Sequence, residues 1–543
     1  MESVSKRLRG VDAKWWFITA FVLMCCAYEY GRVLHLRPQP HHLMRQCDCL
    51  GPAYNYYIGD PNLFHPWMCN LHADMDTSGE SAGEFPLIYW FMGMLWRVIG
   101  HSEFAYRLFG LLLHFLGSYA LFRTAQRVLR SGFWAGWLSL LFFTSPAIVY
   151  FAVSFLPDVP AFDLALIGWW CFSSYHLRRE RKWLYAALFF MALGALLKIT
   201  AGMSLLALLG VLCYETIFRG RVRDRWRAFP HPAAAWLAFL GAIALVLAWY
   251  VYAAQYNAIH NAPYTPNSLW PIWKMTAEEF DRATTFGRNI LVFELFDLPV
   301  WAIFIAFLAV FFIGLRRSPI QVVLLNAALL IGAFLYLLGW FQALNNHDYY
   351  FINPMIMLVV LSLSGLWYLS QYHTRFFADP WTKGVAMVVL LYATAFAAFD
   401  AQLRFRNGGS LAGHTSFTLV HAPQLDHWEE EQYWSMRGFL DIQPYLLSLG
   451  ITRDDRVIIA PERTWQNGLY LAGKRGWNDY TMYLNDTAHV DQCIANGARY
   501  LFLLEEEWTR RSYMQRYLQH PIGEHDGVRI YDLRSLSSRT ETP

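Results

Sequence analysis

The sequence predicts a polytopic α-helical membrane protein with a small α/β domain at its C-terminal end. Two features of composition indicate the membrane class: 56% of the residues are hydrophobic and only 16% are charged, whereas soluble domains carry about a quarter charged residues. Long apolar runs recur up to residue 400. The net charge of +3 is too small to indicate nucleic-acid binding, and neither a glycine-rich phosphate loop nor a zinc-finger spacing is present.

The apolar runs predict eleven membrane spans. The first, at 15–28, follows a basic N-terminal segment and lacks a small-residue cleavage site, so we expect an uncleaved helix that starts in the cytoplasm. The segment at 85–100 is short and interrupted by Arg97, which favours a helix lying in the membrane interface. The ten other spans are expected at 104–122, 133–155, 160–175, 183–198, 202–218, 232–254, 298–315, 319–340, 350–370 and 384–400.

Basic residues in the connecting loops predict the orientation of these spans. With the N-terminus inside, the inner loops hold the basic segments at 123–130, 178–182, 219–227, 316–317 and 375–383. The outer turns near Pro157 and Asn345 hold no Lys or Arg. The loop of 31–100 and the C-terminus are therefore expected outside.

The composition changes after residue 402. A helical pattern near 430–448 is followed by strand-like segments at 456–460, 500–504 and 528–531. The predicted organisation is a transmembrane domain of 1–402, with 31–100 as its outer catalytic loop, and an outer α/β domain of 403–543.

The outer loop concentrates the residues that suggest chemistry. Between 45 and 86 it brings acids, bases and aromatics together beside the membrane. Transfer of a sugar from a lipid phosphate needs a carboxylate to take the acceptor proton and cations to hold the leaving phosphate. Asp48 is the candidate for the first role, and Arg45, Arg107 and Lys198 are candidates for the second. Arg45 precedes Asp48 by three residues, so one helical turn would place both on one face and favour the ionised carboxylate.

Each candidate also has a simpler interpretation. Asp48 and Asp158, the latter in a Pro-Asp-Val-Pro turn, are of a type that often caps helices. Glu84 precedes Pro86 and suits a turn. Lys198 is of a type that reaches to the interface from a buried stem, and the aromatic residues at 347–350 suit an interfacial belt.

Cysteines and histidines of the outer loop allow two further expectations. In an oxidising compartment, Cys69 is expected to form a disulfide with Cys47 or Cys49. A zinc site is the weaker alternative, because the spacing fits no standard pattern. Its candidate ligands are His41, His42, Cys47, Cys49, His65, Cys69 and His72.

Several motifs, in this order along the chain, resemble the membrane-embedded GT-C glycosyltransferases, and within them the bacterial protein mannosyltransferase/aminoarabinose transferase branch ("family 39"). They are the acidic first outer loop with Arg-x-x-Asp and Glu-Phe-Pro, Ser102-Glu-Phe-Ala-Tyr-Arg107-Leu, Pro157-Asp158, Leu196-Leu-Lys198 and His347-Asp348-Tyr349-Tyr350. The resemblance covers most of 1–400. It implies an inverting glycosyltransferase that uses a polyprenyl-phosphate sugar donor on the outer face of a bacterial inner membrane.

The resemblance also implies roles for individual residues. Asp48 would be the general base, although its position between two cysteines departs from the family pattern. The substrate-binding residues would be Arg45, Glu84, Arg107, Asp158, Lys198, His347, Tyr349 and Tyr350. No cofactor is implied with certainty, but Asp48, Asp158 and His347 offer ligands for a divalent cation.

The acceptor implied is a glycolipid, lipid A or polysaccharide, or a protein, in a process of the cell envelope such as lipopolysaccharide modification. A polytopic transporter or lipid flippase is the main alternative, but the sequence shows no internal repeat and its acids lie in outer loops. A membrane sensor with a ligand-binding C-terminal segment is a third interpretation, under which Asp48 is dispensable.

Overall fold

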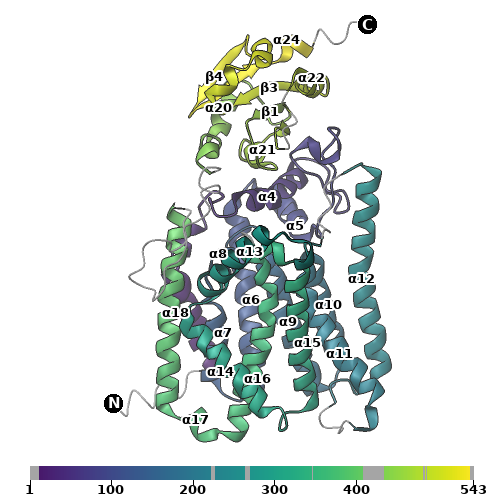
Figure 1. The fold of residues 1–543 in the computed structure, drawn as a ribbon, viewed down its shortest axis with the longest axis vertical. Coiled ribbons are helices and arrows are strands. Elements are labelled where there is room, and N and C mark those ends of the chain that lie inside the picture. The colour runs from purple at the N-terminus through teal and green to yellow at the C-terminus, as the bar shows by residue number, and fades with distance from the viewer. Residues whose placement is uncertain are drawn as a thin grey trace. The chain divides into compact units, whose positions relative to one another are not determined.

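The computed structural model describes residues 12–221, 227–262, 269–344, 347–407, 433–480, 484 and 486–537. The chain forms two compact units (Figure 1). The helical unit comprises Met1–His35, Arg107–Trp249 and Ser268–Gln424, and the mixed unit comprises Leu36–Tyr106, Tyr250–Asn267 and Leu425–Pro543. The outer loop thus shares a unit with the C-terminal segment, while the predicted division at residue 402 stays a prediction.

Helices make up the helical unit, and several long apolar ones run side by side in Figure 1. Their bounds are α2 Ala13–Ala27, α3 Tyr30–Val33, α6 Glu103–Leu129, α7 Gly132–Phe142, α8 Pro146–Phe151, α9 Asp158–Arg178, α10 Arg181–Leu197, α11 Met203–Ile217, α12 Pro232–Ile259, α13 Ala277–Asn289, α14 Leu298–Gly314, α15 Ile320–Gly339, α16 Ile356–Tyr372, α17 Thr374–Ala378 and α18 Pro380–Asn407. The first turns of α6 and the last turns of α12 belong to the mixed unit.

Six helices among the described residues are long and apolar enough to cross a membrane, or seven if one bent pair is a single span. They include α6, α12, α15 and α18, together with α11 and α16 and the short helical turns that precede them. Of the other predicted spans, α2, α7 and α10 have 15, 11 and 17 residues, and α9 carries two aspartates. The polytopic class is therefore confirmed, whereas the total of eleven stays a prediction.

Helix α5, Leu87–Ile99, covers the segment predicted to lie in the interface. Its 13 residues rise about 20 Å, which is less than the roughly 30 Å of a bilayer core. It is too short to cross on its own, in agreement with that prediction.

Helices α9 and α10 form an antiparallel hairpin whose close packing depends on glycine. A Cβ atom on Gly194 would lie 2.9 Å from the carbonyl oxygen of Ala161, and one on Gly168 would meet Met191 at 2.7 Å. Small residues allow helix backbones to approach in this way. The hairpin brings the C-terminal end of α10, at Lys198, beside the N-terminal end of α9, at Asp158.

The mixed unit contains a five-stranded sheet with the strand order β2-β1-β3-β5-β4. Strands β1, β2 and β3 are parallel, and β5 runs antiparallel to both β3 and β4. The predicted strands near 456–460, 500–504 and 528–531 are confirmed. The bounds are β1 Arg456–Ala460, β2 Arg475–Asn478, β3 Ala498–Leu503, β4 Pro521–His525 and β5 Val528–Asp532, with short helices that include α20 Ile442–Ser448, α21 Asn467–Leu471, α22 Thr487–Ala495, α23 Glu506–Thr509 and α24 Arg534–Ser537.

The outer loop is attached directly to this sheet. Asn70 forms a parallel bridge with Gly476 of β2, and the Gly476 N–H donates to the Cys69 carbonyl at 3.1 Å. Leu71 is fully buried in the same hydrophobic core as Ile458 and Trp477. The sheet therefore fixes the loop that carries the candidate base.

Candidate functional site

Helix α4, Leu43–Ile58, presents Asp48 and Arg45 one turn apart, as the sequence predicts. Arg45 forms an ion pair with Glu84, and Tyr89 of α5 donates a hydrogen bond to Glu84 Oε1 at 2.7 Å. The Tyr89 hydroxyl also lies 3.3 Å from the Cys49 sulfur. The structure thus gathers three of the predicted site residues, Arg45, Asp48 and Glu84, on α4 and the loop that leads into α5.

The surroundings of Asp48 shift the pKa of its carboxyl group. The side chain is half-buried, and its Oδ1 atom is shielded from solvent with no hydrogen-bond partner among the described residues. Burial raises the pKa of Asp48 to about 7, with Arg45 and a hydrogen bond from Gln466 opposing the shift and Glu84 adding to it. Arg45 acts in the predicted direction, but desolvation outweighs it.

Gln466 is a residue that sequence reasoning missed. It precedes α21, its Oε1 atom accepts from the Cys69 N–H at 2.8 Å, and its Nε2 atom donates to the Cys47 carbonyl at 3.3 Å. The side chain fits against Gly51, where an added Cβ atom would lie 2.8 Å from it. Gln466 is 419 residues beyond Cys47, and no local pattern marks so distant a contact.

The predicted disulfide is wrong in this structure, in which all eight cysteines are free. The Cys69 sulfur lies near Asn55 Oδ1, at 3.8 Å, and near the Gly51 carbonyl at 4.0 Å. It therefore meets α4 beyond Cys49, whose sulfur faces Tyr89. Although Cys47, Cys49 and Cys69 belong to one loop, no two of them form a disulfide.

The geometry does not gather the seven candidate zinc ligands into one site. No three of its seven candidate ligands, all of which are described residues, place ligand atoms within 4.8 Å of one another. Burial raises the pKa of Cys49 and of Cys69 to about 12, which disfavours the thiolate form that binds metal.

In the helical unit, Asp158 and Lys198 form a second cluster. Asp158 is fully buried, and Lys198 Nζ lies 3.3 Å from its Oδ1 atom. The same ammonium lies 5.4 Å from the ring centre of Tyr349 and 4.7 Å from that of Tyr350. His347 stacks on Tyr350 with ring centres 5.2 Å apart. Five of the predicted binding residues therefore come together here.

Arg107 lies deeper than the sequence suggested. It is fully buried, donates to the Val153 carbonyl and stacks over Phe155 at 4.3 Å. These contacts suit a residue that shapes the helices around the site, and the predicted role of Arg107 in substrate binding stays a prediction.

A buried arginine with three carboxylates was also missed. Arg404 of α18 lies 2.6 Å from Asp400, 3.0 Å from Asp348 and 3.8 Å from Glu294. Arg404 and Asp348 are almost completely buried. Asp348 starts the short helical turn that carries Tyr349 and Tyr350, so this cluster anchors the turn whose rings lie beside Lys198. The signal available in the sequence was Asp400 and Arg404 at the end of an apolar run.

The divalent-cation set named from the sequence is divided between the units. Asp48 belongs to the mixed unit, and Asp158 and His347 belong to the helical unit. A cation held by all three stays a prediction, with carboxylate and imidazole ligands of suitable type.

Comparisons with known proteins agree with the resemblance to glycosyltransferases found in the sequence. Residues 83–252 match the family model of dolichyl-phosphate-mannose-protein mannosyltransferases. No curated protein sequence matches the chain.

Solved structures share the fold at low sequence identity. ArnT from Cupriavidus metallidurans, in the apo state, aligns with a TM-score of 0.56 and 13% identity, covering 96% of this chain and 98% of ArnT. The oligosaccharyltransferase AglB from Archaeoglobus fulgidus was solved with an inhibitory peptide and a dolichol-phosphate. It aligns with a TM-score of 0.50 and 12% identity, covering 90% of this chain and 69% of the AglB chain. The arabinofuranosyltransferase AftD from Mycobacteria aligns with a TM-score of 0.52 and 14% identity, covering 96% of this chain and 41% of the AftD chain.

The fold is therefore that of the GT-C glycosyltransferases, and the resemblance found in the sequence is confirmed. The matching family model and the solved neighbours all describe glycosyltransferases of this superfamily.

Proposed function

We propose that this protein is an inverting glycosyltransferase that moves a sugar from a polyprenyl-phosphate donor to a hydroxyl acceptor on the outer face of the membrane. The observation that carries the proposal is Asp48, beside Arg45: its Oδ1 atom is buried with no hydrogen-bond partner in the described part of the chain, and burial raises its pKa to about 7. The fold supports the reaction class, and the dolichol-phosphate bound to AglB supports a lipid-phosphate donor.

In the proposed reaction, the ionised Asp48 accepts the proton of the acceptor hydroxyl as its oxygen attacks the anomeric carbon. The bond between the sugar and the phosphate breaks on the opposite face, so the configuration inverts. The Arg45–Glu84–Tyr89 network holds α4 and α5 together around the base. A base with a pKa near the working pH combines a useful ionised fraction with proton affinity.

Lys198 is the proposed ligand of the leaving phosphate. It lies at the C-terminal end of α10 with only 12% of its side chain exposed. A cation held against Asp158 and two tyrosine rings has a fixed position, which favours stabilisation of charge as the phosphate departs. Asp158, Tyr349, Tyr350 and His347 would position it, and Arg107 would shape the helices behind it.

The proposed setting is a bacterial inner membrane with the site facing the periplasm, and the acceptor a glycolipid, lipid A or polysaccharide, or a protein. The decisive experiment is transfer of labelled sugar by the purified protein in detergent. A transporter or flippase would move the lipid-linked sugar between leaflets of a vesicle without forming a glycosylated product. Lipid-linked sugars that accumulate in a deletion strain would identify the donor.

The pH profile should report the ionisation of Asp48. With a pKa of about 7, the ionised fraction rises from about a tenth at pH 6 to about nine tenths at pH 8. We therefore expect kcat/KM to rise about tenfold over this interval and to level off above it. A flat profile between pH 5.5 and 8.5, with chemistry rate-limiting, would contradict a titrating base at this position.

Replacing Lys198 should impair donor use. Lys198→Met keeps the length of the side chain and removes its charge, so we expect kcat/KM for the donor to fall about tenfold or more, in line with the loss of a charged hydrogen bond. Lys182→Met, at an exposed lysine of the same helix, is the matched control. Unchanged kinetics across a donor titration would exclude Lys198 from phosphate binding.

A further inference from the structure

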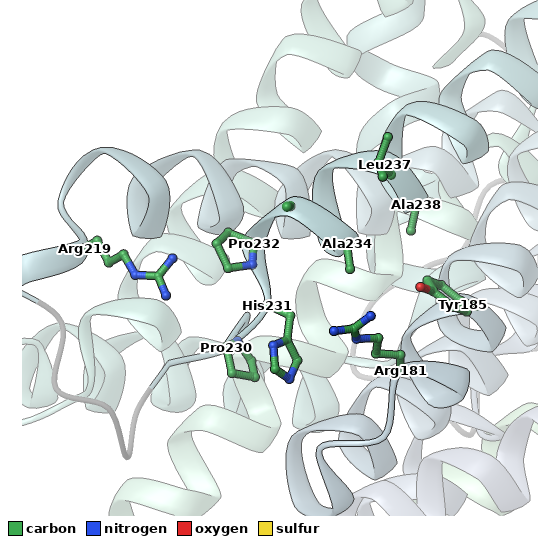
Figure 2. A pocket seen from close by; sticks show the side chains of 10 residues that line it. Arg181, Tyr185, Arg219, Pro230, His231, Pro232, Ala234, Leu237 and Ala238 are labelled. Carbon is green, nitrogen blue, oxygen red and sulfur yellow. The ribbon is translucent and has the colours of Figure 1, made fainter.

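A pocket lies within the helical unit, where α10 and α12 begin (Figure 2). Its volume is about 760 Å³, and Arg181, Arg219 and His231 contribute its polar lining. Tyr185 and Leu237, with three alanines of α12, form its apolar side. The pocket is therefore lined by basic side chains at its entrance and by apolar side chains along one wall.

The guanidinium groups at this entrance are available to a ligand. Figure 2 shows the Arg181 side chain extending toward His231, while Arg219 approaches from the start of the next connection. Among the described residues, neither arginine forms an ion pair. Within the described part of the chain, Glu180 and Glu215, two acids close in sequence to these arginines, have other partners: Glu180 pairs with Lys182 at 2.7 Å, and Glu215 accepts from the N–H groups of Ala228 and Phe229.

The apolar wall continues along α12. Leu237 is 73% exposed and Leu240 is 58% exposed, and α12 is a candidate membrane span. Exposed leucines on a spanning helix face the hydrocarbon of the bilayer. A molecule seated in the pocket would thus place an anionic group between the arginines and an aliphatic chain along α12.

The position in the membrane identifies the class of ligand. Arg219, which lines the pocket, opens the arginine-rich segment 219–227 of the sequence, and the distribution of basic residues assigns that segment to the cytoplasmic boundary. Anionic phospholipids attract basic groups at that boundary, and basic pockets between membrane helices hold their headgroups. The outer-face reaction makes no use of this pocket.

We propose that the pocket binds a glycerophospholipid with a net negative headgroup, its phosphate held by Arg181 and Arg219 and its acyl chain against Leu237. The proposal is independent of the glycosyltransferase reaction, because binding is measured without turnover. Free phosphate shares the headgroup chemistry but lacks the chain, so it is the discriminating competitor.

The test titrates the full-length protein in detergent with single lipids and counts bound molecules by native mass spectrometry. We expect phosphatidylglycerol to bind at least about tenfold more tightly than the zwitterionic phosphatidylcholine. The R181Q/R219Q variant should bind phosphatidylglycerol about twenty-five-fold more weakly, at roughly fivefold for each charge removed. Inorganic phosphate at the lipid concentration should not displace the lipid.

The matched control is R316Q/R375Q, which removes two exposed arginines assigned to the same boundary that do not line the pocket. We expect it to change phosphatidylglycerol binding by less than about twofold. Leu237→Asn, at an exposed position, keeps the charges and should weaken lipid binding several-fold. Equal binding of the two lipids by the wild type, equal losses in the two arginine pairs, or displacement by inorganic phosphate would each overturn the proposal.

Discussion

Asp48→Asn is expected to lower the rate of sugar transfer at least about a hundredfold, because a positioned base contributes about 10²–10⁴-fold to such reactions. The amide keeps the shape of the carboxyl group but cannot accept the acceptor proton. Asp48→Glu should retain part of the activity, since its carboxylate is displaced by one methylene group. Rates are measured with saturating donor and the purified variant in detergent.

The substitution should leave folding intact. Because burial raises the pKa of Asp48, the folded protein disfavours the charged carboxylate, and a neutral amide avoids that cost. Donor binding by Asp48→Asn should therefore match that of the wild type. Asp60→Asn is the control, because Asp60 is an exposed acid of the same loop that pairs with His65. If Asp48→Asn transfers sugar at the wild-type rate, Asp48 is not the general base, and Glu84 or Asp158 becomes the next candidate.

The sequence predicted the parts of the site that depend on local patterns. Hydropathy placed α6, α12, α15 and α18, and the three-residue spacing of Arg45 and Asp48 correctly placed both on one turn of a helix. Short strand-like segments rich in β-branched, aromatic and other apolar residues located β1, β3 and β5. In each case, the determining residues lie within one element.

The missed features depend on contacts between distant segments. Gln466 reaches the Asp48 helix from more than 400 residues away, and Arg404 meets acids from three parts of the chain. The expected disulfide failed for a related reason, since loop spacing does not fix the direction of a side chain. The raised pKa of Asp48 results from burial, which the sequence does not show. The sequence shows only the neighbouring Arg45, which lowers that pKa.

Removing Arg404 should destabilise the helical unit more than any substitution at an exposed arginine. Arg404→Met leaves Asp348, Asp400 and Glu294 without their shared cation, and breaking a buried ion pair from one side costs about 3–5 kcal/mol. We expect a lower melting temperature in detergent and a low yield of monodisperse protein. Sugar transfer should fall too, because Asp348 starts the turn that carries Tyr349 and Tyr350 beside Lys198.

The comparison that isolates this effect uses Arg316→Met, which removes an exposed arginine of the same unit and should leave the melting temperature within about 1 °C. The double variant Arg404→Met/Asp348→Asn removes one of the stranded charges and should recover part of the lost stability, because fewer buried carboxylates then lack a counter-charge. Thermal unfolding of the four proteins in the same detergent measures both differences. Equal melting temperatures for Arg404→Met and Arg316→Met would show that the cluster contributes no net stability, and the three acids would then have to be protonated or hydrated in the folded protein.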